Sequence, residues 1–195
     1  MNINKHKLLT SLFPVLVYCP PALSDTNNQP VAQQLKEEAQ VKTKAFATQL
    51  KQTLKSAIEA GGLVQGINVC SSLAGEIAVQ HSTNGWTVSR ISLKNRNPNN
   101  TPTNWQIDIL KTFNNQVTID DKAKDLVYGE IHKTDSHKEY RFVKATPTAP
   151  ICLNCHGKDI NPQVHKHISN LYPQDKAINY NIGEVRGALV LTKRL

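Results

Sequence analysis

The sequence predicts an α+β domain in which helices pack against one face of an antiparallel sheet. Two stretches with helical periodicity come first. Runs rich in β-branched and aromatic residues follow, with one short helical stretch among them. The turns between the predicted strands are too short for the repeated crossover helices that a parallel sheet requires. The length of 195 residues fits one domain, and 39% hydrophobic residues suffices for one core.

Residues 1–24 are predicted to form a cleaved export signal. A basic start precedes the apolar run LLTSLFPVLVY, which is too short to span a bilayer comfortably, and ALS (22–24) supplies the small residues that a signal peptidase reads. We expect the mature protein to begin at Asp25 and to be soluble and periplasmic or otherwise exported, without stable membrane insertion. A lipoprotein signal ending at Cys19 is the alternative, although Tyr18 stands where lipidation needs a small residue.

The charge balance is basic, with 23 Lys and Arg against 15 Asp and Glu and a net charge of +8. The basic residues are scattered, and no run of five or more like charges occurs. We therefore expect a solvated basic surface and no nucleic-acid partner.

A long N-terminal helix is predicted over residues 31–58, ending at Gly61-Gly62. Its apolar residues recur at spacings of four and seven: Leu35, Ala39, Phe46, Leu50, Leu54 and Ile58. A second helix is predicted over 63–80, and its apolar face includes Cys70. The mature chain is thus expected to consist of a helical segment, residues 25–61, followed by a domain of residues 62–195.

The remaining predicted elements are shorter. Four runs predict strands, the middle two joined as a hairpin by a polar turn: 86–93, 125–132, 138–146 and 183–195. A short amphipathic helix is predicted over 104–113, and the stretch around His165, His167 and Pro173 is expected to be irregular. Both tryptophans are expected in the core.

Cys152, Cys155 and His156 form a cluster in APICLNCHGKD, and three chemistries use such a cluster. A redox dithiol of the thioredoxin type opens a helix after a strand near the start of a βαβ fold, which this sequence does not predict. A zinc site needs four ligands. Cys70 would complete a Cys₃His set, but neighbouring residues such as Cys155 and His156 rarely chelate one ion in good geometry, and no second pair exists unless His165 or His167 replaces it.

Covalent haem attachment accounts for every residue of the cluster. Two thiols add across the two vinyl groups of haem, and the following histidine becomes an axial ligand of the iron. Gly157 lets the backbone turn away close to the macrocycle. This attachment takes place outside the cytoplasm, in agreement with the predicted export signal. The sequence therefore predicts one haem c per chain, bound through Cys152, Cys155 and His156.

The second axial ligand stays open when only the residue types are considered. Methionine is excluded, because Met1 is the only one and lies in the predicted signal. Cys70 suits a ligand and a small buried hydrophobe equally well. The full set of candidates is Cys70, His81, His132, His137, His165 and His167.

Four stretches resemble a bacterial c-type haem domain family with a PAS-like fold, found as stand-alone exported proteins and as sensing parts of signalling proteins. They are GINVCSSLAGEIA, GWTVSRISLKNRNPNNTPTNWQ, ICLNCHG and IGEVRGALVL, in the family's order. The resemblance implies a PAS-like antiparallel sheet flanked by helices, with a long N-terminal helix before a haem-binding domain. It also implies that Cys152 and Cys155 attach haem, and that His156 and Cys70 bind the iron from opposite sides.

The same resemblance places Arg90, Lys94 and Arg96 beside the haem, where they would neutralise its propionates. Arg186, in the last matching stretch, is left open between a structural role and a propionate contact.

Two functions stay open. The first is a haem sensor of redox state or of a diatomic gas such as nitric oxide or carbon monoxide, which requires a signalling partner. The second is a periplasmic electron-transfer cytochrome with a redox partner, which the basic charge predicts to be acidic. A zinc-binding Cys₃His module is less favoured. No enzyme is expected, because no nucleophile–base pair or carboxylate pair stands out and a haem with two axial ligands has no position for substrate.

Overall fold

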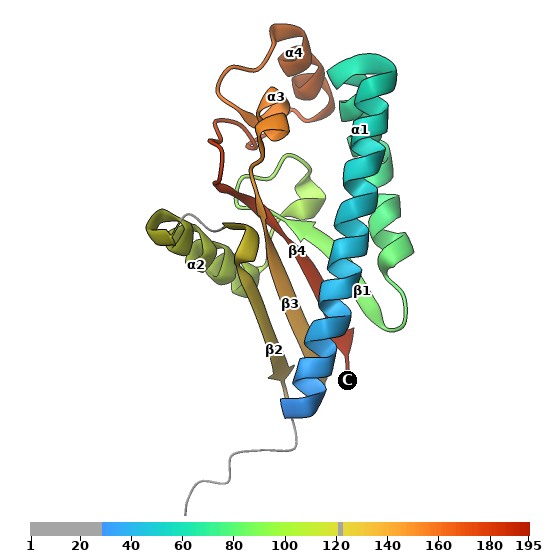
Figure 1. Cartoon of the computed structure of the whole chain (residues 1–195), viewed down its shortest axis with the longest axis vertical. Helices are drawn as coiled ribbons and strands as arrows, with labels where there is room; N and C mark the ends of the chain where they lie inside the picture. Colours follow the sequence, from blue (N-terminus) through green and yellow to red (C-terminus); the bar gives the residue numbers. More distant parts are fainter. Residues whose placement is uncertain (1–28, 121–122) are drawn as a thin grey trace, which may run out of the picture.

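A four-stranded antiparallel sheet forms the centre of the computed structural model, which describes residues 29–120 and 123–195 (Figure 1). The strands lie in the order β1 (Trp86–Ile91), β4 (Val185–Arg194), β3 (Lys138–Pro147) and β2 (Val127–Lys133). The last strand therefore pairs between β1 and β3, while β2 and β3 form the predicted hairpin. The predicted α+β class with an antiparallel sheet is confirmed.

The longest helix, α1 (Gln29–His81), contains both helices that the sequence predicted. Gly61 and Gly62 leave helical geometry, and Gly62 has φ 72°, a left-handed conformation that glycine adopts without strain. The chain reverses at this bend, and the two halves lie side by side. Gln49 Nε2 donates to Gln80 Oε1 at 3.0 Å between the two halves. The predicted helix end at Gly61-Gly62 is confirmed.

One face of the sheet packs against both halves of α1. The buried residues of this core are Leu35, Ala39, Phe46, Ile77, Trp86, Val88, Tyr140, Phe142, Leu189 and Leu191. Phe46, from the first half of α1, is completely buried. The core therefore continues across the predicted division at residue 61, because the helical segment before it supplies part of the interior.

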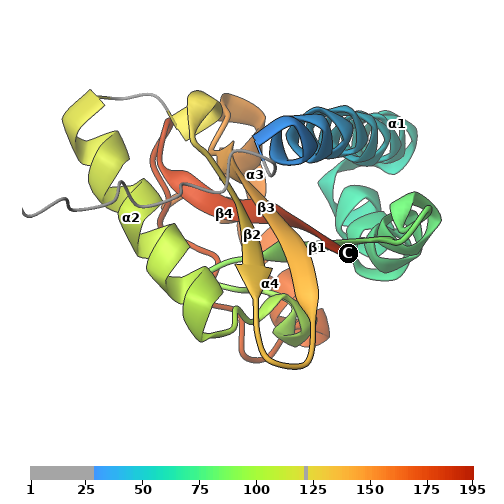
Figure 2. The same cartoon turned by 90° about the horizontal axis from the view of Figure 1, so that it is seen from below.

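Helix α2 (Asn104–Asp120) covers the opposite face of the sheet (Figure 2). Leu110 and Phe113 pack there with Val143 and Val190. The expectation that helices pack against one face only is wrong. An amphipathic pattern shows that a helix buries one stripe, but it does not indicate which face of a sheet receives that stripe.

Helix α4 (Pro162–Leu171) forms where the sequence was expected to be irregular. Asn161 caps it by accepting hydrogen bonds from the backbone N–H groups that follow, and Pro162 occupies the first turn. Val164 and Ile168 pack against Ile67 near the bend of α1. This helix and the short α3 (Leu153–His156) lie at one end of the sheet, called here the motif end.

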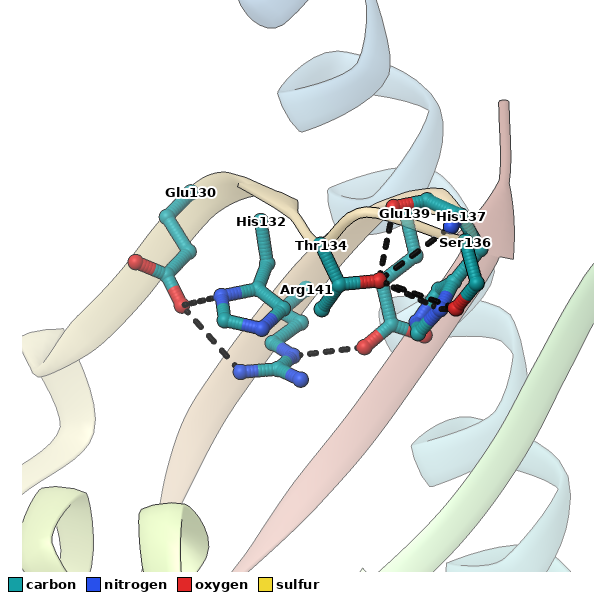
Figure 3. Close-up of polar contacts among 7 residues, drawn as sticks. All are labelled: Glu130, His132, Thr134, Ser136, His137, Glu139 and Arg141. Atoms are coloured by element: carbon teal, nitrogen blue, oxygen red, sulfur yellow. Dashed lines mark hydrogen bonds and ion pairs between the residues drawn. The ribbon is translucent and has the colours of Figure 1, made fainter.

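The turn between β2 and β3 marks the opposite end of the sheet, called here the hairpin end. Arg141 donates from Nε to Glu139 Oε1 at 2.7 Å, and its Nη1 lies 3.5 Å from Glu130 Oε1 (Figure 3). Its guanidinium also lies 4.5 Å from the centre of the Trp105 ring. These contacts neutralise a cation whose side chain is only 12% exposed.

Helix α1 is long and apolar enough, by length and composition alone, to cross a membrane. Core helices of soluble proteins meet the same criterion, and α1 is interrupted at its bend and packs against the sheet. The predicted absence of membrane insertion stays a prediction. The predicted export signal, the alternative at Cys19 and the predicted start at Asp25 lie outside the described residues.

Candidate functional site

The cysteine motif follows β3 at the motif end of the sheet. A short 3-10 helix, η4 (Pro150–Cys152), leads into α3, so the motif forms two helical turns. Gly157 ends α3, and a Cβ at this position would lie 2.7 Å from the Leu153 carbonyl oxygen. A side chain at residue 157 would therefore force the chain away from the path that carries it out of the motif.

The two motif cysteines and Cys70 are free thiols. Cys155 packs beside the small apolar cluster of Ile67, Val164 and Ile168. Burial raises the pKa of Cys155, while the Arg96 charge acts in the opposite direction. Both motif thiols are thus available for covalent attachment of a ligand.

His156 is held in one tautomer. Its Nδ1 lies 2.7 Å from the Ala177 carbonyl oxygen, and because a carbonyl only accepts, Nδ1 carries the proton. Burial, together with the charges of Arg186 and Arg96, lowers the pKa of His156 to about 2. The ring is therefore neutral near pH 7, and Nε2 is the ring nitrogen that keeps a lone pair, which Arg186 Nη1 approaches at 3.4 Å.

Cys70 shares this environment, although it comes from the second half of α1. Burial raises the pKa of its thiol, and the positive charges of Arg90, Arg186 and Arg96 oppose that effect. The charge of Cys70 in turn acts on Cys155. The fold thus brings together the motif and the cysteine predicted as second ligand.

Arg90 and Arg186 bring two positive charges to the site. Among the side chains that the structure describes, neither guanidinium forms an ion pair with a carboxylate. Burial lowers the pKa of Arg90, and the Arg186 charge lowers it further. Arg186 Nη1 lies 3.4 Å from Nε2 of His156. Two like charges in a half-buried site favour an anionic ligand.

Lys94 and Arg96, the other predicted basic residues, are engaged by the protein itself. Lys94 Nζ lies 4.2 Å from the centre of the Tyr180 ring. Arg96 forms an ion pair with Asp175 at 3.0 Å and donates to the Cys155 carbonyl oxygen at 2.6 Å. The propionate role stays a prediction for all three residues, and Arg90 is the one for which the described side chains supply no other partner.

The alternative axial histidines are engaged elsewhere or exposed. His167 Nε2 lies 2.6 Å from Asn68 Oδ1, and His81 Nε2 lies 2.8 Å from Gln49 Oε1. His132 and His137 belong to the hairpin end, and His165 is exposed. Among the residues that the structure describes, no three or more His, Cys, Asp or Glu side chains converge as a metal site. The zinc alternative thus has no ready ligand set there.

Sequence reasoning missed three contributors to the site: the Ala177 carbonyl, Asp175 and Tyr180. Tyr180 meets the His156 ring edge-on, with 6.4 Å between the ring centres. No local pattern reveals these residues, because Arg96 and Ala177 are 81 positions apart in the chain. Arg186 lies in a stretch that resembles the family, but the sequence did not decide between a structural role and a propionate contact.

The donor set fits the predicted haem. Two free thiols suit its vinyl groups, the neutral imidazole and the thiol of Cys70 suit its iron, and the Arg90–Arg186 pair suits its carboxylates. Ile151, next to Cys152, is 52% exposed and offers apolar surface within the motif.

Comparisons with known proteins agree with this fold. The chain is similar to the cyanobacterial heme-protein Tll0287, with a TM-score of 0.59 and 23% identity over 80% of this chain and 95% of that one. No curated protein matches. Residues 28–193 match the model of the Tll0287-like family. Because this match spans most of the chain and agrees with the resemblance noted from the sequence, the protein belongs to the Tll0287-like family.

Proposed function

We propose that this chain binds haem covalently through Cys152 and Cys155, with His156 and Cys70 as axial ligands. The observation that carries the proposal is the state of His156: neutral, held through Nδ1 by Ala177, and adjacent to two free thiols. Family membership and the likeness to a cyanobacterial heme-protein support haem binding. The Cys-x-x-Cys-His spacing supports the covalent attachment.

Different residues would hold different parts of the haem. When bound, haem supplies an iron atom that changes oxidation state and can bind a small gas. His156 would offer Nε2 to the iron, and Cys70 would supply a second ligand from α1. Arg90 and Arg186 would pair with the carboxylates of haem and relieve their own mutual repulsion.

A sensor is the form of the function that α1 favours. Cys70 lies on the second half of this helix, whose apolar face packs against the sheet with the first half. A thiolate ligand stabilises ferric iron, so we expect Cys70 to bind more weakly on reduction, take up a proton and leave. Its release would free part of α1 to move, and an exported signalling partner would read that movement.

Electron transfer is the alternative, and the surface around the motif favours it. Lys158, Lys166 and Lys176 are exposed on and near α3 and α4. Such lysines would guide an acidic redox partner to the haem edge. Neither form of the function includes a catalysed reaction or a nucleic-acid partner.

The test is a set of spectra of the mature protein from a host with haem-maturation machinery. We expect the colour to stay with the polypeptide after acid–acetone extraction, and Cys70→Ala to change the ferric electron paramagnetic resonance spectrum. Reduced wild-type protein should bind carbon monoxide. Zinc without haem would refute the proposal, and reduced protein that stays six-coordinate and refuses carbon monoxide would favour electron transfer.

A further inference from the structure

Arg96 contacts two backbone carbonyls next to His156, one in the motif and one in the loop that faces the ring. Its Nη2 donates to the carbonyl oxygen of Cys155, the preceding residue, at 2.6 Å. The same nitrogen lies 3.3 Å from the Ala177 carbonyl oxygen, which accepts the Nδ1 proton of His156. One buried cation therefore holds the backbone that carries the histidine and also the acceptor that orients its ring.

Asp175 completes this arrangement, called here the Arg96 clasp and formed by Arg96, Asp175, Cys155 and Ala177. Asp175 Oδ2 lies 3.0 Å from Arg96 Nη2, and its Oδ1 accepts the Ala177 N–H at 2.8 Å. The Arg96 and Asp175 side chains are only 13% and 10% exposed. A charged pair at this depth constrains geometry, because its partners are costly to separate.

Two backbone hydrogen bonds join the same loop to the motif. Tyr180 N–H donates to the His156 carbonyl oxygen at 3.0 Å, and Asn179 N–H donates to the Gly157 carbonyl oxygen at 3.1 Å. These bonds hold the loop near the motif, and neither of them involves the Ala177 carbonyl. The ion pair of Arg96 and Asp175 contacts both polar groups of Ala177, its carbonyl oxygen through Arg96 and its N–H through Asp175.

We propose that Arg96 is a positioning residue that fixes the tautomer and ring orientation of His156 through Ala177. This role rests on the proposed function, in which His156 Nε2 faces the iron, and it differs from the propionate contact predicted for Arg96. Partners of a metal-bound histidine commonly act in this way, and their loss changes metal affinity by about 10- to 100-fold.

The experiment measures the His156 tautomer in the full-length chain produced without haem and kept reduced, labelled with ¹⁵N at histidine. In wild-type protein we expect Nδ1 protonated and Nε2 bare near pH 7. In Arg96→Gln we expect a mixture of tautomers, with a measurable fraction protonated at Nε2. Arg96→Lys keeps the charge beside Asp175 and should rescue the ratio in part. If Arg96→Gln does not fold, Arg96→Lys is measured against wild type in its place.

Arg141→Gln is the matched control, because Arg141 is 12% exposed and ion-paired but lies at the hairpin end. It should leave the His156 tautomer unchanged. A single Nδ1–H tautomer in Arg96→Gln, or an equal change in Arg141→Gln, would overturn the positioning role. In haem-loaded Arg96→Gln we expect several low-spin ferric species where wild type shows one. Haem-free wild-type protein from the maturation host would refute the proposed function alone, since the tautomer is measured without haem.

Discussion

Two arginines at opposite ends of the sheet are equally buried but neutralised differently. Arg141, 12% exposed, has two glutamates and a tryptophan ring as partners. Arg96, 13% exposed, has one aspartate and two backbone carbonyls. The hairpin end therefore balances its charge with side chains alone, whereas the motif end uses its cation to hold main-chain geometry.

The difference extends to the surroundings of each arginine. Arg90 and Arg186 add positive charge at the motif end without a carboxylate partner among the described residues. A region that is left with unneutralised charge is less stable by itself and is completed by a ligand. The comparison thus indicates that the charges of the hairpin end serve stability, whereas the unpaired charges of the motif end favour an anionic ligand.

The largest expected effect comes from removing each arginine's charge. Arg96→Met leaves Asp175, 10% exposed, without its cation, and should destabilise the haem-free chain by about 3–5 kcal/mol. Arg141→Met leaves glutamates that are 23% and 38% exposed, and should cost about 1 kcal/mol. Urea unfolding measures both, and equal losses would remove the distinction. Adding Asp175→Asn to Arg96→Met should recover much of the loss.

Acid should weaken the motif end. The pKa of His156 in the folded, haem-free protein is about 2, against about 6.5 in the unfolded chain. The contribution of His156 to the free energy of unfolding is fully present above pH 6.5. Below pH 6.5 it decreases by about 1.4 kcal/mol per pH unit for one proton, until the pH reaches the pKa of the folded protein. Urea unfolding between pH 7 and pH 4 measures this slope, and His156→Gln should remove it. An unchanged slope in that variant would assign the acid sensitivity to other groups.

Alkali should weaken the packing of strand β2. Burial, aided by Glu130, raises the pKa of Tyr128 on β2 to about 12, above its value near 10 in the unfolded chain. The unfolded state loses this proton first, so stability decreases as pH rises from 10 to 12. Tyr128→Phe should flatten the alkaline part of the unfolding profile. A profile that stays as steep would contradict the assignment.

Replacing a glycine in each of two strands should produce a smaller difference in stability. A Cβ on Gly187, beside Arg186, would lie 2.3 Å from the Ile91 carbonyl oxygen, whereas one on Gly129 would meet the Tyr140 hydroxyl at 2.6 Å. Backbone in a paired strand moves less than the tip of a side chain. Gly187→Ala should therefore cost roughly 3 kcal/mol and Gly129→Ala roughly 1 kcal/mol. Thermal unfolding checks the order, which the reverse result would refute.

Local patterns in the sequence predicted most elements of the fold. The helix break at Gly61-Gly62 and the hairpin turn have direct signals, and the structure contains both. Helix α4 was missed because it buries only Val164 and Ile168 among polar residues. The cap of Asn161 followed by Pro162 was a usable signal.

The candidate site also contains residues with a local sequence signal and residues without one. The motif cysteines and His156 lie close together in the sequence, so their spacing alone predicts haem attachment. The apolar stripe of its helix predicts that Cys70 points inward, and the structure places Cys70 near the motif. The Arg96 clasp was not readable, because it joins a loop after β1 to a loop before β4. Such contacts depend on how the strands are ordered in the sheet, which no local pattern encodes.

The smallest expected effect concerns Lys94, whose Nζ lies 4.2 Å from the centre of the Tyr180 ring. Lys94→Gln should cost only about 0.5 kcal/mol, because the contact is partly exposed to water. Tyr180 also meets the His156 ring, so a cation–ring contact that mattered for positioning would alter the His156 tautomer as well. We expect that tautomer, read from the ¹⁵N histidine spectrum, to stay as in wild type. A tautomer shift as large as in Arg96→Gln would extend the positioning role from the clasp to the Tyr180 side of the ring.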